Sequence, residues 1–204
     1  MHSLRSELQA RMRLSKLSGL TVARLKQMPS IRGKLRRIDS NLRQLQDLGG
    51  CRAVLPTIED ARALVSAMTE ASRHALKSED RYMDEPRSSG YRSHHLVFSF
   101  MPRDARESGY EGRLIEVQIR SRLQHSWATA VEAVALHRGE NLKAGMGSAD
   151  WLRLFELMSL EFAASEGCDY AKDGSNSRTQ EIIDLEGSPE AHPASWSLLM
   201  AFHL

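Results

Sequence analysis

Apolar and polar residues alternate most regularly over residues 113–121. A period of two is typical of a strand with one buried face, because successive side chains point to opposite sides of a sheet. One side carries Ile115, Val117 and Ile119, and the other carries Glu116, Gln118 and Arg120. Shorter patterns predict strands over residues 51–55 and 95–101, and residues 102–112 are expected to form a polar, hairpin-like connection.

Helices are predicted where apolar residues recur every three or four positions. One covers residues 4–17 and is basic, and a second covers residues 31–38, after Pro29. A third is capped by Thr57, and its buried stripe runs over residues 61–75. A fourth follows the clearest strand, over residues 122–136.

The last third of the chain changes character along its length. The helix that Ser148 can cap is apolar on most sides, so it is either well buried or half of an interface. Residues 173–177 and 187–189 are expected to be linkers, because small and polar residues gather there. Residues 196–202 are apolar again.

Length, composition and charge limit the class of protein and the kind of partner. A chain of 204 residues, with 41% hydrophobic and 26% charged residues, is ordinary for one soluble domain with an appendage. The net charge is only +2, but up to Arg43 the basic residues far outnumber the acids, which are Glu7 and Asp39. This basic block predicts a polyanionic partner such as a triphosphate or RNA, and a solvated helix face is the other interpretation.

The cysteines and the apolar runs exclude several classes. Cys51 and Cys168 lie far apart and form no CxxC pair, so neither a zinc site nor a disulfide framework is expected, and a cytoplasmic location is predicted. No apolar run is long enough to span a bilayer, so no membrane partner is expected. The basic N-terminus lacks the apolar core of a signal peptide.

The segment over residues 87–95 reads Arg-Ser-Ser-Gly-Tyr-Arg-Ser-His-His. Gly90 permits close approach of the backbone, and an exposed Tyr91 would offer a ring on which a base can stack. Arg87, Arg92 and His95 would supply cations for phosphates. The competing interpretation is that Tyr91 starts a strand and packs inward, as aromatic residues in strands often do.

Two carboxylates are candidates for chemistry. Glu116 shares its polar strand face with Gln118 and Arg120, although such a face can also simply meet water. Asp47 precedes the glycine pair at positions 49 and 50, where Asp commonly shapes a turn. Together the two could hold Mg²⁺, because hard cations take carboxylate oxygens.

Four blocks of residues carry a resemblance to a known family. In order they are Arg24-Leu25-Lys26 with Ser30-Ile31 and Lys34; Asp47-Leu48-Gly49-Gly50-Cys51-Arg52; Ser89-Gly90-Tyr91-Arg92-Ser93-His94-His95; and Glu116-Val117-Gln118-Ile119-Arg120 with Gln124-His125-Ser126-Trp127-Ala128. With this order and spacing, residues 24–136 resemble the synthetase domain of the RelA/SpoT family, the makers of the alarmones ppGpp and pppGpp.

The resemblance implies an α+β fold, a nucleotidyltransferase-like mixed β-sheet surrounded by helices. It divides the chain into an N-terminal basic helix over residues 1–23, a synthetase core over 24–138, a C-terminal apolar helix over 139–166 and a divergent tail over 167–204. No room remains for the family's hydrolase domain, so a small, single-domain synthetase with a C-terminal extension fits better than a long form.

The resemblance also implies an activity, the transfer of the ATP pyrophosphate to the 3′-hydroxyl of GDP or GTP, with Mg²⁺ as cofactor. The ATP-binding residues would be Arg24, Lys26, Ser30, Lys34 and Arg37, with Arg52 stacked on adenine. The catalytic and Mg²⁺-binding residues would be Asp47 and Glu116, and Glu116 would also take the 3′ proton. The acceptor-binding residues would be Arg87, Tyr91, Arg92, His95 and Gln118.

Two departures from the family pattern leave alternatives open. Arg87-Ser88-Ser89 stands where the family often has Lys-Pro-Asn, and residues 131–133 and 137–138 depart from its usual Glu-His and Tyr-Lys. The chain could therefore be a toxin-like relative that uses an adenosine nucleotide or the 3′ end of tRNA as acceptor. It could also be a non-catalytic nucleotide-binding or interaction module. A homo-oligomer and an antitoxin partner stay open.

Overall fold

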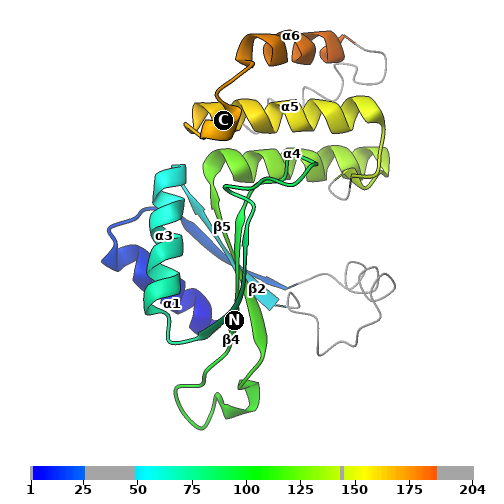
Figure 1. Ribbon diagram of the computed structural model, residues 1–204. Coiled ribbons are helices and arrows are strands. Elements are labelled where there is room, and N and C mark those ends of the chain that lie inside the picture. The colour runs from blue at the N-terminus through cyan, green and yellow to red at the C-terminus, as the bar shows by residue number, and fades with distance from the viewer. Residues whose placement is uncertain (1, 26–48, 143–144, 188–204) are drawn as a thin grey trace. The chain divides into compact units, whose positions relative to one another are not determined.

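The computed structural model describes residues 2–25, 49–142 and 145–187. These residues form the mixed α+β fold that the sequence predicted, and they divide into two compact units (Figure 1). Unit 1 comprises Met1–Arg81 and His94–Ser121, and unit 2 comprises Tyr82–Ser93 and Arg122–Leu204. The N-terminal helix belongs to unit 1 and the loop before His94 belongs to unit 2, and the division expected from the sequence stays a prediction.

Unit 1 is built on a five-stranded sheet with the strand order β1-β2-β5-β4-β3. The strands are β1 (Leu20–Leu25), β2 (Gly49–Leu55), β3 (Ala75–Arg81), β4 (His94–Ser99) and β5 (Leu114–Ser121). β2 and β5 pair in parallel, and the other pairs are antiparallel. The predicted strands over residues 51–55, 95–101 and 113–121 are therefore confirmed as β2, β4 and β5, and the polar connection between β4 and β5 contains a short 3₁₀ helix at Ser108–Tyr110.

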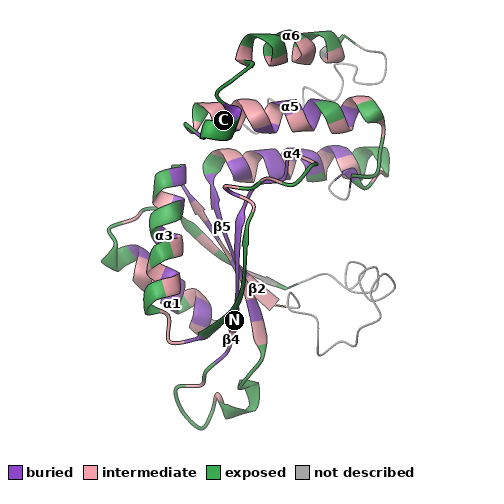
Figure 2. Cartoon of the chain, viewed as in Figure 1, coloured by how far each residue is buried: buried purple, intermediate pink, exposed green. Residues whose placement is uncertain are grey.

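Two helices, α1 (His2–Leu14) and α3 (Ile58–Ala71), contact each other and the sheet, and both lie on one of its faces (Figure 1). The hydroxyl of Thr57 caps α3 as predicted, because it accepts a hydrogen bond from the Asp60 nitrogen at 3.1 Å. The buried positions of α3 recur every three or four residues, and Figure 2 shows them turned toward the sheet.

The prediction that the α3 stripe extends to Ala75 is wrong. The helix ends at Ala71, and Ala75 begins β3, in which every residue is exposed. A fully exposed edge strand has no apolar face, so its sequence shows no alternation that could reveal it. β1, the other edge strand, was not predicted either, because its apolar residues Leu20 and Val22 lie on its exposed face.

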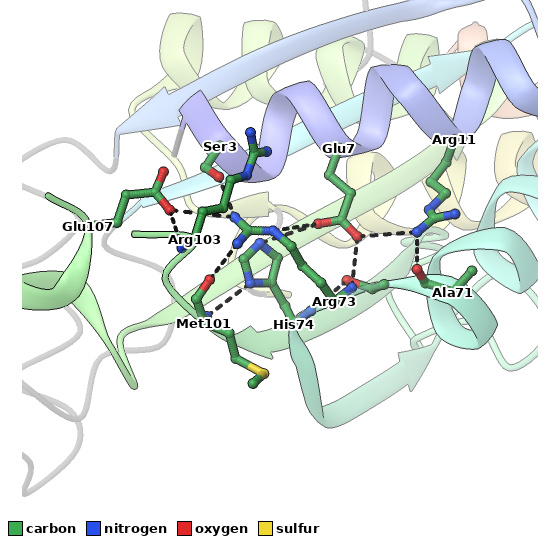
Figure 3. Close-up of polar contacts among 10 residues, drawn as sticks. Ser3, Glu7, Arg11, Ala71, Arg73, His74, Met101, Arg103 and Glu107 are labelled. Carbon is green, nitrogen blue, oxygen red and sulfur yellow. Dashed lines mark hydrogen bonds and ion pairs between the residues drawn. The ribbon is translucent and has the colours of Figure 1, made fainter. Parts of the chain in front are cut away.

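A buried polar cluster joins α1 to the chain that follows α3 (Figure 3). Glu7, the one acid of α1, accepts a hydrogen bond from the Arg73 nitrogen at 3.0 Å and lies 3.4 Å from His74 Nε2. The Met101 nitrogen donates to His74 Nδ1 at 3.0 Å, so the ring proton sits on Nε2, facing Glu7. Burial, followed by the charge of Arg73, lowers the pKa of His74. His74 is therefore held as the neutral tautomer.

Unit 2 contains the helices α4 (Arg122–Arg138), α5 (Ala149–Ser165) and α6 (Ser175–Glu186), and α5 contacts both of the others (Figure 1). α4 confirms the helix predicted over residues 122–136. α5 begins after Ser148 as predicted, but the Ser148 side chain makes no capping hydrogen bond. The apolar cluster of this unit is formed by Tyr91, Trp127, Val131, Trp151, Leu154 and Phe155, among others. The face of α5 that carries Trp151, Leu154 and Phe155 is thus buried, and an interface formed by this helix stays a prediction.

The tail expected to be a linker is partly helical. A 3₁₀ helix at Asp169–Ala171 leads into α6, which begins inside the expected linker at residues 173–177. Two ion pairs join α6 to α5, Arg178 with Glu161 at 2.6 Å and Arg153 with Glu181 at 2.7 Å. The partners of each ion pair lie in different helices, so no local pattern of the sequence predicts these contacts. No helix in the described part of the chain is long and apolar enough to cross a membrane.

Candidate active site

The predicted polar face of β5 is present in unit 1, and Gln118 is at its centre. The strand register aligns Gln118 with Arg52 on β2 and with His95 on β4. Along β5, Glu116 and Arg120 are the next residues on the same face, because side chains on one face of a strand are two positions apart. Four polar side chains from three neighbouring strands therefore gather around the Gln118 amide.

Hydrogen bonds connect these side chains. Gln118 Nε2 donates to Glu116 Oε2 at 2.7 Å. Gln118 Oε1 accepts from Arg120 Nη2 at 3.1 Å and from Arg52 Nε and Nη2 at 3.3 and 3.2 Å. His95 Nδ1 lies 3.3 Å from Glu116 Oε1. Both oxygens of the Glu116 carboxylate therefore face groups that can hold it in place.

Burial differs across this group of residues. Arg120 is 1% exposed and Gln118 is 9% exposed, whereas the Glu116 side chain is 20% exposed. The carboxylate is thus open to a ligand, while the residues that contact it are largely shielded from water. A carboxylate that is partly open and held by fixed donors can accept a proton or bind a cation.

The backbone next to Glu116 is tightly packed. Gly50 pairs with Glu116 in the parallel ladder, and a Cβ atom at Gly50 would lie 2.7 Å from the Glu116 carbonyl oxygen. This close approach requires glycine at position 50. On its other side Gly50 pairs with Arg24, which places the backbone of Arg24 in line with that of Glu116.

The predicted nucleotide loop over residues 87–95 is shared between the two units. His95 belongs to unit 1 and contacts Glu116, whereas Arg87, Tyr91 and Arg92 belong to unit 2. A turn closed by a hydrogen bond from the Gly90 nitrogen to the Arg87 oxygen shapes this loop. Gly90 has φ +83° and packs closely on α5, and its carbonyl accepts a hydrogen bond from Ser159 at 2.5 Å. Close packing on α5 therefore explains why residue 90 is a glycine.

The expectation of an exposed ring at Tyr91 is wrong, because Tyr91 is 4% exposed. Its ring centroid lies 6.3 Å from that of Trp127 and 6.1 Å from that of Tyr82. The guanidinium of the exposed Arg87 lies 4.3 Å from the Tyr82 ring centroid and 6.0 Å from that of Tyr91. The competing interpretation, that Tyr91 packs inward, describes its position correctly, and its role in acceptor binding stays a prediction.

Arg92 is also buried. Its Nη2 forms a 2.6 Å ion pair with Glu166 and a 3.3 Å contact with the Cys168 sulfur. The role of Arg92 in acceptor binding stays a prediction. A cation paired with a buried carboxylate stabilises the protein around it, and breaking such a pair is costly.

Five predicted site residues lie outside the described residues: Lys26, Ser30, Lys34, Arg37 and Asp47. Among the residues that are described, no group of three or more His, Cys, Asp or Glu side chains could hold a metal ion. No role was predicted for Arg120 from the sequence, although its place two residues after Gln118 on the same strand face was the signal that could have identified one. Tyr82 had no comparable signal, because its contact with Arg87 depends on the turn.

The chain is similar to proteins of a known family. The family described as "Region found in RelA / SpoT proteins" matches residues 23–140. The chain is 30% identical over 109 residues to GTP pyrophosphokinase YjbM from Bacillus subtilis, across 52% of this chain and 51% of that protein. It is 29% identical over 119 residues to a GTP pyrophosphokinase from Photobacterium angustum, across 58% and 15%. The matched part thus spans about half, or less, of each of these relatives.

A solved structure shares the fold. The small alarmone synthetase 1 from Bacillus subtilis bound to its product pppGpp matches with a TM-score of 0.68 and 22% identity, over 84% of this chain and 89% of that chain. The predicted fold class is therefore confirmed.

Proposed function

The chain belongs to the family of RelA/SpoT proteins, and on that basis we propose that it is an ATP-dependent pyrophosphokinase. The acceptor is the 3′-hydroxyl of GDP or GTP, and the products are AMP and the alarmones ppGpp or pppGpp. The observation that carries this proposal is the Glu116 carboxylate, held by Gln118 and His95 yet open on the polar face of the sheet. The relatives called GTP pyrophosphokinases and the pppGpp-bound neighbour support the choice of reaction.

The reaction needs a group that accepts one proton. The acceptor oxygen O3′ forms a bond to the β-phosphorus of ATP, and the bond from that phosphorus to the oxygen shared with the α-phosphate breaks, releasing AMP. The proton of the 3′-hydroxyl passes to Glu116. Phosphoryl-type transfer depends mainly on positioning and on neutralising charge, so fixed donors around Glu116 suit it.

Mg²⁺ would be held by Glu116 and by Asp47, which lies outside the described residues. The described residues fit a metal bound in this way, because Mg²⁺ in nucleotide enzymes commonly takes one or two carboxylates and completes its shell with substrate phosphates and water. A dedicated cluster of protein ligands is then unnecessary. Bound Mg²⁺ would neutralise the charge that develops on the phosphates.

ATP would be bound by the predicted cations and by Arg52, which lies beside Gln118. The family resemblance assigns Arg87 and His95 to acceptor binding, and this assignment stays a prediction. A second candidate acceptor, an adenosine nucleotide or the 3′ end of tRNA, is favoured by Ser88 and Ser89, which replace the family's usual Pro-Asn. An antitoxin partner and a homo-oligomeric state stay predictions of the sequence.

One experiment tests the proposed function and its alternatives together. The protein is incubated with Mg²⁺ and ATP labelled at the γ-phosphate, in parallel with GDP, GTP, GMP, ATP and deacylated tRNA. We expect label on GDP or GTP and an equal amount of AMP. Label in a 3′-pyrophosphorylated adenosine nucleotide or on tRNA, with none on GDP or GTP, would replace the acceptor by the second candidate. No transfer to any acceptor, together with retained nucleotide binding, would favour a non-catalytic module and overturn the proposal.

A further inference from the structure

Arg120 has no role in the reaction as described so far, yet it is 1% exposed and carries a charge. Burying a guanidinium is costly unless it is paired or hydrogen-bonded. One of its hydrogen bonds goes to Gln118 Oε1 at 3.1 Å. We propose that Arg120 is a positioning residue that acts through the Gln118 amide to fix Glu116. This inference rests on the proposed function, because it assigns the proton acceptor to Glu116.

The chemistry of the donors sets the orientation of the amide. Arginine only donates hydrogen bonds, so the Gln118 atom facing Arg120 and Arg52 must be the oxygen. The nitrogen then faces Glu116, which only accepts when it is ionised. A reversed amide would place its nitrogen against two guanidinium groups and its oxygen against a carboxylate. All three contacts therefore favour one orientation.

The two arginines differ in whether they can move away from the Gln118 amide. Arg52 is half-buried and is the residue proposed to stack on adenine, so ATP competes with Gln118 for its guanidinium. Arg120 is buried and remains beside Gln118 whatever Arg52 does. We infer that Arg120 keeps the amide oriented after Arg52 has moved to the nucleotide. The contact between Arg120 and Gln118 is therefore needed while ATP is bound.

The consequence for Glu116 is a fixed carboxylate. Glu116 Oε2 accepts a hydrogen bond from Gln118 Nε2 at 2.7 Å, and the other oxygen of the carboxylate, Oε1, then faces His95. Without Arg120, the amide can rotate and present its oxygen to the carboxylate, which would repel Glu116 from its place. A shift of about 1 Å in a reacting group can cost roughly 100-fold in rate. The expected defect is therefore in turnover and not in substrate binding.

Steady-state kinetics of single and double variants test the assignment. Arg120→Met removes the donors and keeps an unbranched side chain; we expect kcat to fall by about 10-fold to 100-fold with KM for ATP and acceptor changed less than about twofold. In the Gln118→Ala background, Arg120→Met should change kcat by less than about twofold, because the amide on which it acts is gone. Additive losses, or a rise in acceptor KM as the main effect, would overturn the proposal.

Gln118→Glu provides a second test if Arg120→Met fails to fold. The new carboxylate still accepts from both arginines, but it has no N–H group for Glu116 and its negative charge repels the Glu116 carboxylate. We expect a loss of kcat at unchanged KM. Near-normal kcat for Gln118→Glu would refute a positioning role.

A readout that needs no activity separates this inference from the proposed function. The side-chain amide resonances of Gln118, assigned in ¹⁵N spectra by their loss in Gln118→Ala, should shift in Arg120→Met or Arg120→Lys. If that shift occurs and the wild-type protein transfers no pyrophosphate, the proposed function fails and the contact between Arg120 and Gln118 stands. If transfer occurs and the Gln118 amide is insensitive to both substitutions, the inference alone fails.

Discussion

The side-chain nitrogen of Gln118 lies 2.7 Å from the Glu116 carboxylate, on the same face of β5. This contact places a neutral donor beside the group that is proposed to take the 3′ proton. Replacing Glu116 by Gln preserves the shape and removes the proton acceptor. We expect Glu116→Gln to lower kcat by roughly 10²-fold to 10⁴-fold, the usual contribution of a general base, with little change in the unfolding midpoint.

The matched control for this substitution is Glu79→Gln. Glu79 also pairs with a histidine, His94, at 2.7 Å, but it lies on the exposed edge strand β3. We expect its kcat to stay near that of the wild type. Equal losses in both variants would show that the effect comes from the sheet and not from the chemistry of Glu116.

The buried ion pair between Arg92 and Glu166 should contribute to stability. Its side chains are 3% and 6% exposed, and removing one partner leaves a buried charge uncompensated. We expect Glu166→Gln to lower the free energy of unfolding by about 3–5 kcal/mol in urea titrations. The control is Glu181→Gln, at the exposed pair with Arg153, for which a far smaller change is expected. Comparable changes at both sites would contradict the role of burial.

Gly90 should tolerate no side chain. Its φ of +83° disfavours other residues, and an added Cβ would lie 3.1 Å from the Glu156 Cα and from the Phe155 carbonyl oxygen. We expect Gly90→Ala to destabilise the protein by about 2–4 kcal/mol, the sum of backbone strain and overpacking.

Gly112→Ala separates these two causes. Gly112 has φ +73°, and nothing lies within 4 Å of an added Cβ atom. Only backbone strain remains, so a loss of about 1–2 kcal/mol is expected from thermal or urea unfolding. If Gly112→Ala cost as much as Gly90→Ala, close packing of the loop on α5 would not explain the glycine at position 90.

The neutral His74 predicts a loss of stability in acid. Because its pKa is lowered in the folded protein, the unfolded chain binds the proton first as pH falls below the ordinary value of 6.5. Stability from this residue is therefore complete above that pH and declines as pH falls toward the folded pKa. His74→Asn, which keeps an acceptor for the Met101 nitrogen, should show a flatter dependence of unfolding free energy on pH in this window. An unchanged slope would assign the acid sensitivity to other groups.

The sequence predicted those parts of the fold in which a single face meets the core. β5 and α3 have such faces, and their periodic residues located them within a few positions. β1 and β3 are sheet edges with exposed side chains, and α6 is joined to α5 by ion pairs between residues far apart in the sequence. Local sequence patterns predict neither the exposed edge strands nor the ion pairs between α5 and α6.

Part of the candidate site could likewise be predicted from the sequence, and part of it could not. The residues at Glu116 and Gln118 could be recognised because strand alternation put them on one face, and the register that adds Arg52 and His95 follows from pairing. From the sequence, the inward packing of Tyr91 was only one of two interpretations, because its partner Trp127 lies on a helix that comes later in the chain. A motif indicates which residues gather, whereas the direction of a ring depends on packing from distant segments.

The route of the chain between the two units bears on how this protein can be divided. The chain leaves unit 1 after Arg81 and re-enters it at His94, and the intervening Tyr91 completes the cluster built around Trp127 and Phe155. During synthesis, every strand of the sheet is made before the helices that cover Tyr91 exist. A fragment ending at Ser121 would carry this ring without Trp127 and Phe155. No single cut yields two halves that each hold a complete core, so recombination that exchanges α4 to α6 must also exchange residues 82–93.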